Sequence, residues 1–176
     1  EIDVLLVQDG GCAPGYNPVT AFITFHLEEI GREIYATSEG LKSLVSGKRD
    51  DFVRLDYHPQ ILKKLDRIHG VFHAAPISEW RGALLRGERY RDFVKKEIQQ
   101  KAAETIIKKI GKSIIAIGCN VTFRGIMELC DFLPTSIHVF FVPVTIDIDI
   151  AGTECIGENT VIEMGAEKIR CYMADA

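Results

Sequence analysis

Residues 2–36 read IDVLLVQDGGCAPGYNPVTAFITFHLEEIGREIYA, and this stretch predicts the fold class. Its first six residues form an apolar run rich in β-branched side chains, which is the pattern of a strand covered on both faces of a parallel sheet. A glycine turn follows, then residues 17–30 place apolar side chains at helical spacing, and residues 33–36 predict a second strand. Together these segments predict one βαβ unit.

The ends of the predicted helix carry their own signals. We expect Asn17 to be its N-cap and Pro18 to occupy its first helical position. Gly31 is the expected stop, because glycine adopts the left-handed backbone that often follows a helix.

The rest of the chain continues to alternate between strands and helices. Residues 40–66 show no clear pattern, apart from a helical piece at 59–65. Beyond them we expect a strand at 70–75, a long amphipathic helix at 87–110 closed by Gly111, a strand at 113–117, a turn at 118–122, a helix at 123–133, a strand at 137–142 and a helix at 159–176. This order predicts an α/β fold, a three-layer sandwich with a mainly parallel sheet, as one domain over residues 1–176.

Composition excludes several classes of protein. The 176 residues carry 21 Lys and Arg against 25 Asp and Glu, a net charge of -4, so no broad positive field favours nucleic acid or a membrane surface. The apolar stretch at 137–144 is far shorter than the ~20 residues that cross a bilayer. Five cysteines without a C-x-x-C pair favour reduced thiols in the cytoplasm over disulfides or zinc.

Two loops after predicted strands carry residues suited to chemistry. In a parallel sheet, ligands gather at the carboxyl ends of the strands. The glycine-rich loop at 10–17 lets backbone N–H groups approach an anion, although a tight turn without a ligand is the alternative. It matches neither a Walker A loop nor G-x-G-x-x-G. Asp147 and Asp149 follow an apolar strand, and one of them can serve as a general base; a solvated or capping turn is the alternative.

Taken in order, the loops resemble those of the phosphofructokinase family. The chain reads GGCAPGYN at 10–17, GCNVT at 118–122, PVTIDID at 143–149 and GTECIG at 152–157. The family has GGDAPGMN, GGDGS or GGDDS, P(K/G)TIDND and GT-D-(S/T)-I-G in the same order. The likeness covers most of the chain and includes the segments at 31–35 and 40–41.

The resemblance implies transfer of a phosphoryl group from ATP or pyrophosphate to fructose 6-phosphate. Asp147 matches the base that deprotonates the sugar 1-hydroxyl, and Asp149 matches the second carboxylate of that loop. Thr145 matches a contact to fructose 6-phosphate, and Ile146 lies between these residues in the same substrate-binding loop. The resemblance also implies a homo-oligomer and a chain that is the donor-binding part of a longer protein, whose sugar-binding remainder lies elsewhere.

On the donor side, the resemblance implies a phosphate-binding surface and a Mg²⁺ ion. The residues implied at the phosphates are Gly10, Gly11, Gly118, Cys119, Asn120, Val121 and Thr122. Asn120 occupies the place of the family's magnesium-associated aspartate, and its amide oxygen is a possible metal ligand.

Several donor-side residues depart from the family. Val121 and Val144 replace the residues that separate ATP users from pyrophosphate users, and Cys12 replaces an aspartate. Residues 70–77 contain no counterpart of the family's donor-binding arginine, and Arg81 is out of register. Two alternatives to an active kinase therefore stand: an impaired paralogue that binds nucleotide or sugar phosphate in a regulatory role, and a generic anion-binding domain of flavodoxin type.

Overall fold

The computed structural model describes residues 1–11, 13–57, 71–73, 82–85, 87, 89–145, 147, 149–153, 155 and 158–174. Within these residues, one six-stranded sheet has the order β4-β3-β2-β1-β5-β6. The strands are β1 (Ile2–Gln8), β2 (Ile34–Thr37), β3 (Phe52–Asp56), β4 (Val71–His73), β5 (Ile110–Gly118) and β6 (His138–Pro143). The helices are α1 (Tyr16–Glu29), α2 (Gly40–Ser46), α3 (Lys96–Lys109), α4 (Asn120–Cys130) and α5 (Glu158–Ala174), with single 3-10 turns η1 (Arg49–Asp51) and η4 (Arg91–Val94).

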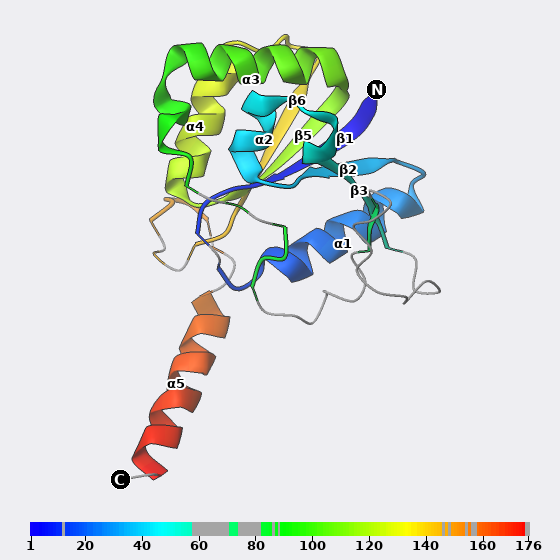
Figure 1. Cartoon of the computed structure of the whole chain (residues 1–176). Coiled ribbons are helices and arrows are strands. Elements are labelled where there is room, and N and C mark those ends of the chain that lie inside the picture. Colours follow the sequence, from blue (N-terminus) through cyan, green and yellow to red (C-terminus); the bar gives the residue numbers. More distant parts are fainter. Residues whose placement is uncertain are drawn as a thin grey trace.

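Helices cover both faces of the sheet. Helix α1 lies on one face, α2, α3 and α4 lie on the other, and α5 extends away from them (Figure 1). Strand β1 shows why both layers form: Leu5 and Val7 belong to the core under α2, α3 and α4, whereas Val4 and Leu6 belong to the core under α1. The predicted three-layer α/β sandwich is confirmed.

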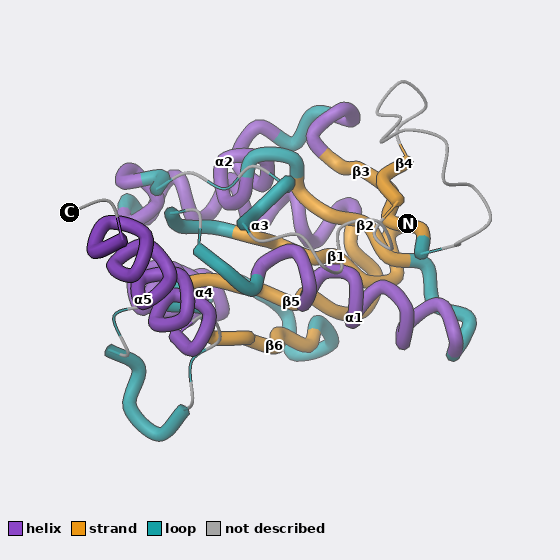
Figure 2. The backbone as a smooth tube through the Cα atoms, turned by 90° about the horizontal axis from the view of Figure 1, so that it is seen from below, coloured by secondary structure: helices purple, strands orange, loops and turns teal. Residues whose placement is uncertain are grey.

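The four strands β2, β1, β5 and β6 run parallel to one another. Figure 2 shows the strands following one another in the order given above, with β4 and β6 at the two edges. Strand β3 is antiparallel to β2 and parallel to β4. Since parallel strands end at the same edge, the loops after β1, β5 and β6 all leave the sheet on one side.

The predicted start of α1 is wrong, and its predicted end is confirmed. Gly15, with φ 104°, is the N-cap, and the helix already begins at Tyr16. Asn17 is used differently: its N–H donates to the carbonyl of Gly82 at 3.1 Å, and its side-chain oxygen accepts from the N–H of Leu84 at 2.8 Å. At the other end, Gly31 has φ 72°, as expected of a glycine that stops a helix.

The long helix predicted at 87–110 starts too early and ends close to the predicted residue, but the stop expected at Gly111 is wrong. Helix α3 begins only at Lys96, because the preceding turn η4 folds Phe93 into the core, where the side chain is 2% exposed. The helix also does not stop at Gly111. Ile110 is its C-cap and pairs directly with Ile2, so helix passes into strand without a turn and Gly111 lies inside β5.

Other predicted bounds shift by a few residues. The turn predicted at 118–122 already contains the first turn of α4, and the helix predicted at 123–133 ends at Cys130. Strand β4 confirms the strand predicted at 70–75, while the helical piece at 59–65 lies outside the described residues. Among the described residues, no helix combines the length and apolar composition that crossing a membrane requires.

Candidate active site

Hydrogen bonds between neighbouring strands bring the three predicted loops to one edge of the sheet. The N–H of Asp9, just after β1, donates to the carbonyl of Ile117 near the end of β5 at 3.0 Å. The N–H of Val144, just after β6, donates to the carbonyl of Gly118 at 2.9 Å. The glycine loop, the turn after β5 and the loop after β6 therefore start side by side.

The glycine loop packs against the first turn of α4. A Cβ on Gly10 would lie 3.4 Å from the hydroxyl of Tyr16, 3.5 Å from the Sγ of Cys119 and 3.6 Å from the Oγ1 of Thr122. A Cβ on Gly11 would meet nothing within 4 Å. Gly11 thus presents bare backbone to an open space, which suits the close approach of a phosphate.

The start of α4 forms the second part of the site. Cys119 is the N-cap of α4, and the side chains of Asn120 and Val121 are exposed. Thr122 is buried, and a Cβ on Gly118 would lie 2.5 Å from its Oγ1, so only glycine fits at position 118. The first N–H groups of a helix have no partner within it, so this turn can hydrogen-bond an anion beside Gly11.

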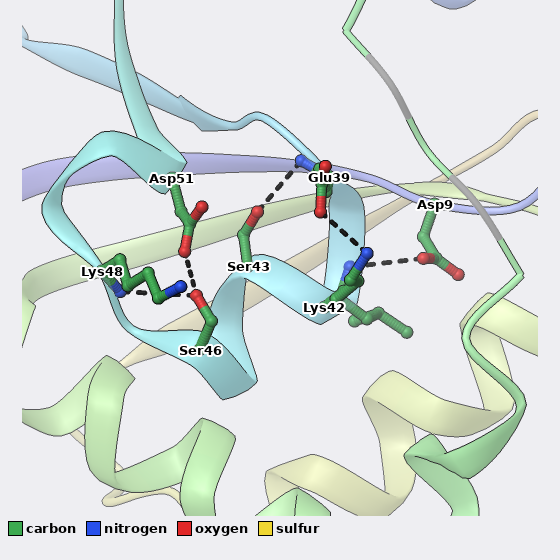
Figure 3. Close-up of polar contacts among 8 residues, drawn as sticks. Asp9, Glu39, Lys42, Ser43, Ser46, Lys48 and Asp51 are labelled. Carbon is green, nitrogen blue, oxygen red and sulfur yellow. Dashed lines mark hydrogen bonds and ion pairs between the residues drawn. The ribbon is translucent and has the colours of Figure 1, made fainter.

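Sequence reasoning missed Asp9, a buried acid at the centre of this edge. One carboxylate oxygen accepts from the N–H of Leu41 at 3.2 Å, and the other accepts from the hydroxyl of Thr122 at 3.3 Å. Figure 3 shows the Asp9 carboxylate directed at the start of α2. The hydroxyl of Tyr16 donates to the backbone carbonyl of Asp9 at 2.7 Å. The available signal was an acidic residue between an apolar strand and the first glycine.

The loop after β6 presents the predicted substrate-side residues. Thr145 is buried, and its hydroxyl oxygen accepts a hydrogen bond from the N–H of Asp147 at 3.0 Å. Asp147 and Asp149 are exposed, while Ile146 lies outside the described residues. A buried threonine thus fixes the backbone of Asp147, and the carboxylate of Asp147 is accessible to a substrate hydroxyl.

Val144 points away from this exposed surface. Its side chain is 1% exposed and belongs to the core under α1, together with Val4 and Leu6. A lysine at this position would place a charge in that core, which is costly without a partner. Val144 therefore contributes packing rather than a charged contact to a ligand.

A second segment lies beside the glycine loop. Asn17 bonds to Gly82 and Leu84, as described above, and a Cβ on Gly87 would lie 3.0 Å from the carbonyl oxygen of Gln8. This segment leads to Arg89, which is exposed. The arginine sought at 70–77 thus has a candidate further along the chain, whereas Arg81 lies outside the described residues.

The residues present suit a Mg²⁺ ion that arrives with phosphates. Among the described residues, no group of three or more His, Cys, Asp or Glu side chains is placed to hold a metal ion. Asn120 supplies one exposed amide oxygen at the start of α4. Mg²⁺ usually keeps several waters and binds through one or two protein ligands plus substrate phosphates, and one amide ligand beside a phosphate surface fits that pattern.

A cavity of about 450 Å³ lies elsewhere, at the opposite edge of the sheet. It is lined by the end of α1, the turn that leads into β2 and the end of β3, including Phe25, Glu28, Arg54 and Tyr57. None of the residues predicted for the site lines it. The candidate active site, formed by the loops after β1, β5 and β6, is therefore separate from this cavity.

Comparisons with known proteins match almost the whole chain. A family model described as Phosphofructokinase matches residues 3–176. An ATP-dependent 6-phosphofructokinase from Aquifex aeolicus is 29% identical over 165 residues, which cover 93% of this chain and 46% of that protein. A pyrophosphate–fructose 6-phosphate 1-phosphotransferase from Thermotoga maritima is 29% identical over 175 residues, covering 97% of this chain and 38% of that protein. The chain thus spans less than half the length of these relatives.

The solved structure of phosphofructokinase from Saccharomyces cerevisiae has a similar fold. It superposes with a TM-score of 0.77 at 17% sequence identity, over 100% of this chain and 24% of that one. At this identity the likeness shows the fold alone.

Proposed function

The chain belongs to the phosphofructokinase family, and on that premise we propose that the protein transfers a phosphoryl group from ATP or pyrophosphate to the 1-hydroxyl of fructose 6-phosphate. The name of one relative given above includes ATP, and the name of the other includes pyrophosphate. The observation that carries the proposal is the side-by-side start of the glycine loop, the turn after β5 and the loop that holds Asp147. A generic anion-binding domain needs no carboxylate loop at this place.

Asp147 acts as the general base in this proposal. Its exposed carboxylate takes the proton of the sugar 1-hydroxyl, whose oxygen then forms a bond to the terminal phosphorus of the donor. The bond from that phosphorus to the donor's bridging oxygen breaks, and ADP or phosphate leaves. Thr145 sets the backbone of Asp147 through the 3.0 Å hydrogen bond, which orients the base before the substrate arrives.

The donor phosphates lie against Gly10, Gly11 and the first turn of α4. Backbone N–H groups there stabilise negative charge, and electrostatic stabilisation together with positioning accounts for most of the catalysis of phosphoryl transfer. Mg²⁺, bound with the donor and touched by Asn120, would neutralise charge on the phosphates. We assign the role of the family's donor-binding arginine to Arg89. Gly87, two residues earlier, packs against the end of β1 and so brings this segment to the glycine loop.

The sugar site is incomplete in residues 1–176 under this proposal. The chain spans less than half of its relatives, so residues 1–176 form the donor-binding domain, and further sugar contacts come from outside it. Assembly as a homo-oligomer and a role in glycolysis in the cytoplasm belong to the same proposal.

A second candidate function is binding without turnover, as in a regulatory paralogue. Asn120 is uncharged at a position where a hard cation favours a negatively charged ligand. The side chain of Val144 is buried in the core under α1. Losing one preorganised charge-stabilising group typically costs on the order of 10²–10³ in rate. Several such losses would leave donor and sugar-phosphate binding as the remaining function.

A coupled assay on the intact protein separates the two functions. The assay supplies Mg²⁺ and fructose 6-phosphate with either ATP or pyrophosphate. We expect turnover with one donor, its loss in Asp147→Ala, and its retention in the control Asp50→Asn, which removes an exposed carboxylate from η1. Calorimetric binding of donor or sugar phosphate without turnover would favour the regulatory paralogue.

A matched pair of arginine variants tests the role of Arg89. Arg89→Ala should raise the KM of the donor about 10-fold or more, since it removes a charge from the phosphates. Arg91→Ala removes an exposed charge from η4 two residues later and should leave the donor KM within about twofold. Equal effects of the two substitutions would contradict the assignment of Arg89.

A further inference from the structure

Asp9 occupies an unusual place for an acid, after a strand whose last five residues are buried and directly before the glycine loop. We propose that Asp9 is a positioning residue of the donor site, whose buried carboxylate holds the glycine loop and the first turn of α4 in their relative places by fixing the hydroxyl of Thr122. The proposal rests on the proposed function, because it assigns that carboxylate a part in binding the phosphoryl donor.

The contacts of Asp9 join three segments that are far apart in the chain. Its own backbone begins the glycine loop, its Oδ2 takes the hydrogen bond of Thr122 in α4, and its Oδ1 takes that of Leu41 in α2. Thr122 lies 113 positions away from Asp9 along the chain. The Asp9 side chain is only 4% exposed, so these bonds lie in a medium where electrostatic interactions are strong.

The backbone around Asp9 is held from two further sides. Tyr16 donates its hydroxyl hydrogen to the Asp9 carbonyl at 2.7 Å. Gly40 approaches so closely that a Cβ on it would lie 2.6 Å from the Gln8 carbonyl oxygen and 2.7 Å from the Asp9 Oδ1. A shift of Asp9 would therefore disturb α1 and α2 together. These contacts hold the start of the glycine loop in one position.

The bond to Thr122 also decides what its hydroxyl can do for a ligand. Its hydrogen is donated to Asp9 Oδ2, and the Sγ of Cys119 lies 3.9 Å from the same Oγ1. That oxygen lies 3.6 Å from the Cβ position of Gly10. Because Thr122 is only 1% exposed and its hydroxyl donates to Asp9, the hydroxyl does not donate to a phosphate oxygen, and its effect on the donor passes through the backbone of α4.

Asp9 differs from Asp147 in the way it acts. Both oxygens of Asp9 already accept hydrogen bonds from the protein, and the side chain is buried, so it does not take a proton from a substrate. It acts through Thr122 and through the loop backbone. Removing its charge should therefore change donor binding and leave sugar binding almost unaltered.

The test is a double-mutant cycle on the intact protein with Mg²⁺ and either donor, ATP or pyrophosphate. Asp9→Asn keeps the side-chain shape and the oxygen that accepts from the N–H of Leu41. Its amide N–H donates a hydrogen bond to the Thr122 hydroxyl, so that hydroxyl changes from donor to acceptor. We expect Asp9→Asn and Thr122→Val each to raise the donor KM about 10-fold, and the double variant to resemble the single variants. The KM for fructose 6-phosphate should stay within about twofold, and Thr122→Ser should restore the wild-type donor KM.

The matched control is Thr24→Val, which removes another buried hydroxyl, one that bonds to the Thr20 carbonyl within α1. Its effect should add to that of Asp9→Asn, because Thr24 bonds to the backbone of its own helix at Thr20. Hydrogen exchange at the Leu41 amide and a melting curve show whether Asp9→Asn stays folded. If Asp9→Asn unfolds, the donor KM of Thr122→Val compared with that of Thr122→Ser tests the proposal instead.

Three results would overturn the proposal. In the first, wild type turns over and Asp9→Asn has an unchanged donor KM. In the second, the effect of Asp9→Asn is undiminished in the Thr122→Val background, so that Asp9 does not act through the hydroxyl. In the third, wild type neither binds nor uses either donor, and then the proposed function fails as well.

Discussion

The N–H of Val144 donates to the carbonyl of Gly118 at 2.9 Å, and this bond ties the loop after β6 to the turn after β5. On the other side of β5, the N–H of Asp9 donates to the carbonyl of Ile117 at 3.0 Å. Strand β5 is therefore the shared neighbour of the loop with Asp147 and of the glycine loop. Single substitutions in any of the three loops should affect one common reaction.

The open space over Gly11 gives a prediction that separates binding from folding. Gly11→Ala places a methyl group where a Cβ meets nothing within 4 Å, so we expect the free energy of unfolding to change by less than about 0.5 kcal/mol. The methyl group would occupy space that a donor phosphate needs, and donor affinity should fall about 10-fold or more. Calorimetric titration with Mg²⁺ and ATP or pyrophosphate measures this loss.

Gly165→Ala is the matched control, because a Cβ there also meets nothing within 4 Å but lies in α5. Its donor affinity should equal that of wild type. Unchanged donor affinity in Gly11→Ala would show that the glycine loop does not approach the phosphates.

Gly40 gives a prediction about stability. A Cβ there would lie 2.6 Å from the carbonyl oxygen of Gln8, and the residue has φ +57°. Gly40→Ala should therefore lower the free energy of unfolding by about 2–4 kcal/mol, from steric overlap and a left-handed backbone together. Gly31→Ala shares the positive φ but meets nothing within 4 Å, and should cost only about 1 kcal/mol. Urea denaturation compares the two; equal losses would contradict the close approach of Gly40.

Asp3 should make stability depend on pH. The hydrogen bond from Lys112, followed by that from Arg32, holds the pKa of Asp3 below its usual value, against the opposing effect of burial. Because the folded pKa lies below the unfolded one, this contribution is present above the unfolded pKa of 3.8 and is lost as pH falls through the folded pKa. Asp3→Asn should cost under about 1 kcal/mol at neutral pH, since solvent and salt screen the pairs.

Unfolding free energies of wild type and Asp3→Asn, measured from pH 7 down to pH 2, test this dependence. The difference between the two proteins should shrink on the acid side and also at high salt. A difference that grew as the pH fell would show that Asp3 is not stabilised in its charged form.

Periodicity predicted the layers of the fold, because buried strands and glycine-stopped helices are local patterns. Ile2–Gln8 and the stop at Gly31 are of this kind. Errors arose where tertiary contacts override local preference. Phe93 is drawn into the core before α3 can start, and Ile110 pairs with Ile2 and so draws Gly111 into β5. The antiparallel strand Phe52–Asp56 lies where the sequence showed no clear pattern.

The site could be predicted only as far as single loops carry signals. The motifs at residues 10–17 and 143–149 predicted the loop proposed for the donor and the carboxylates proposed for the sugar side. Asp9 was missed, because its importance comes from a partner far along the chain, Thr122. No local spacing encodes a contact across 113 positions.

The most direct measurement of the central claim compares binding with turnover in Asp147→Asn. The Asp147 carboxylate is exposed, so its replacement by an amide should leave the melting temperature unchanged, and donor and fructose 6-phosphate affinities should stay within about threefold. As the proposed general base is gone, kcat should fall by about 10²–10⁴. An Asp147→Asn protein that turns over at the wild-type rate would contradict the claim that these three loops form one phosphoryl-transfer site.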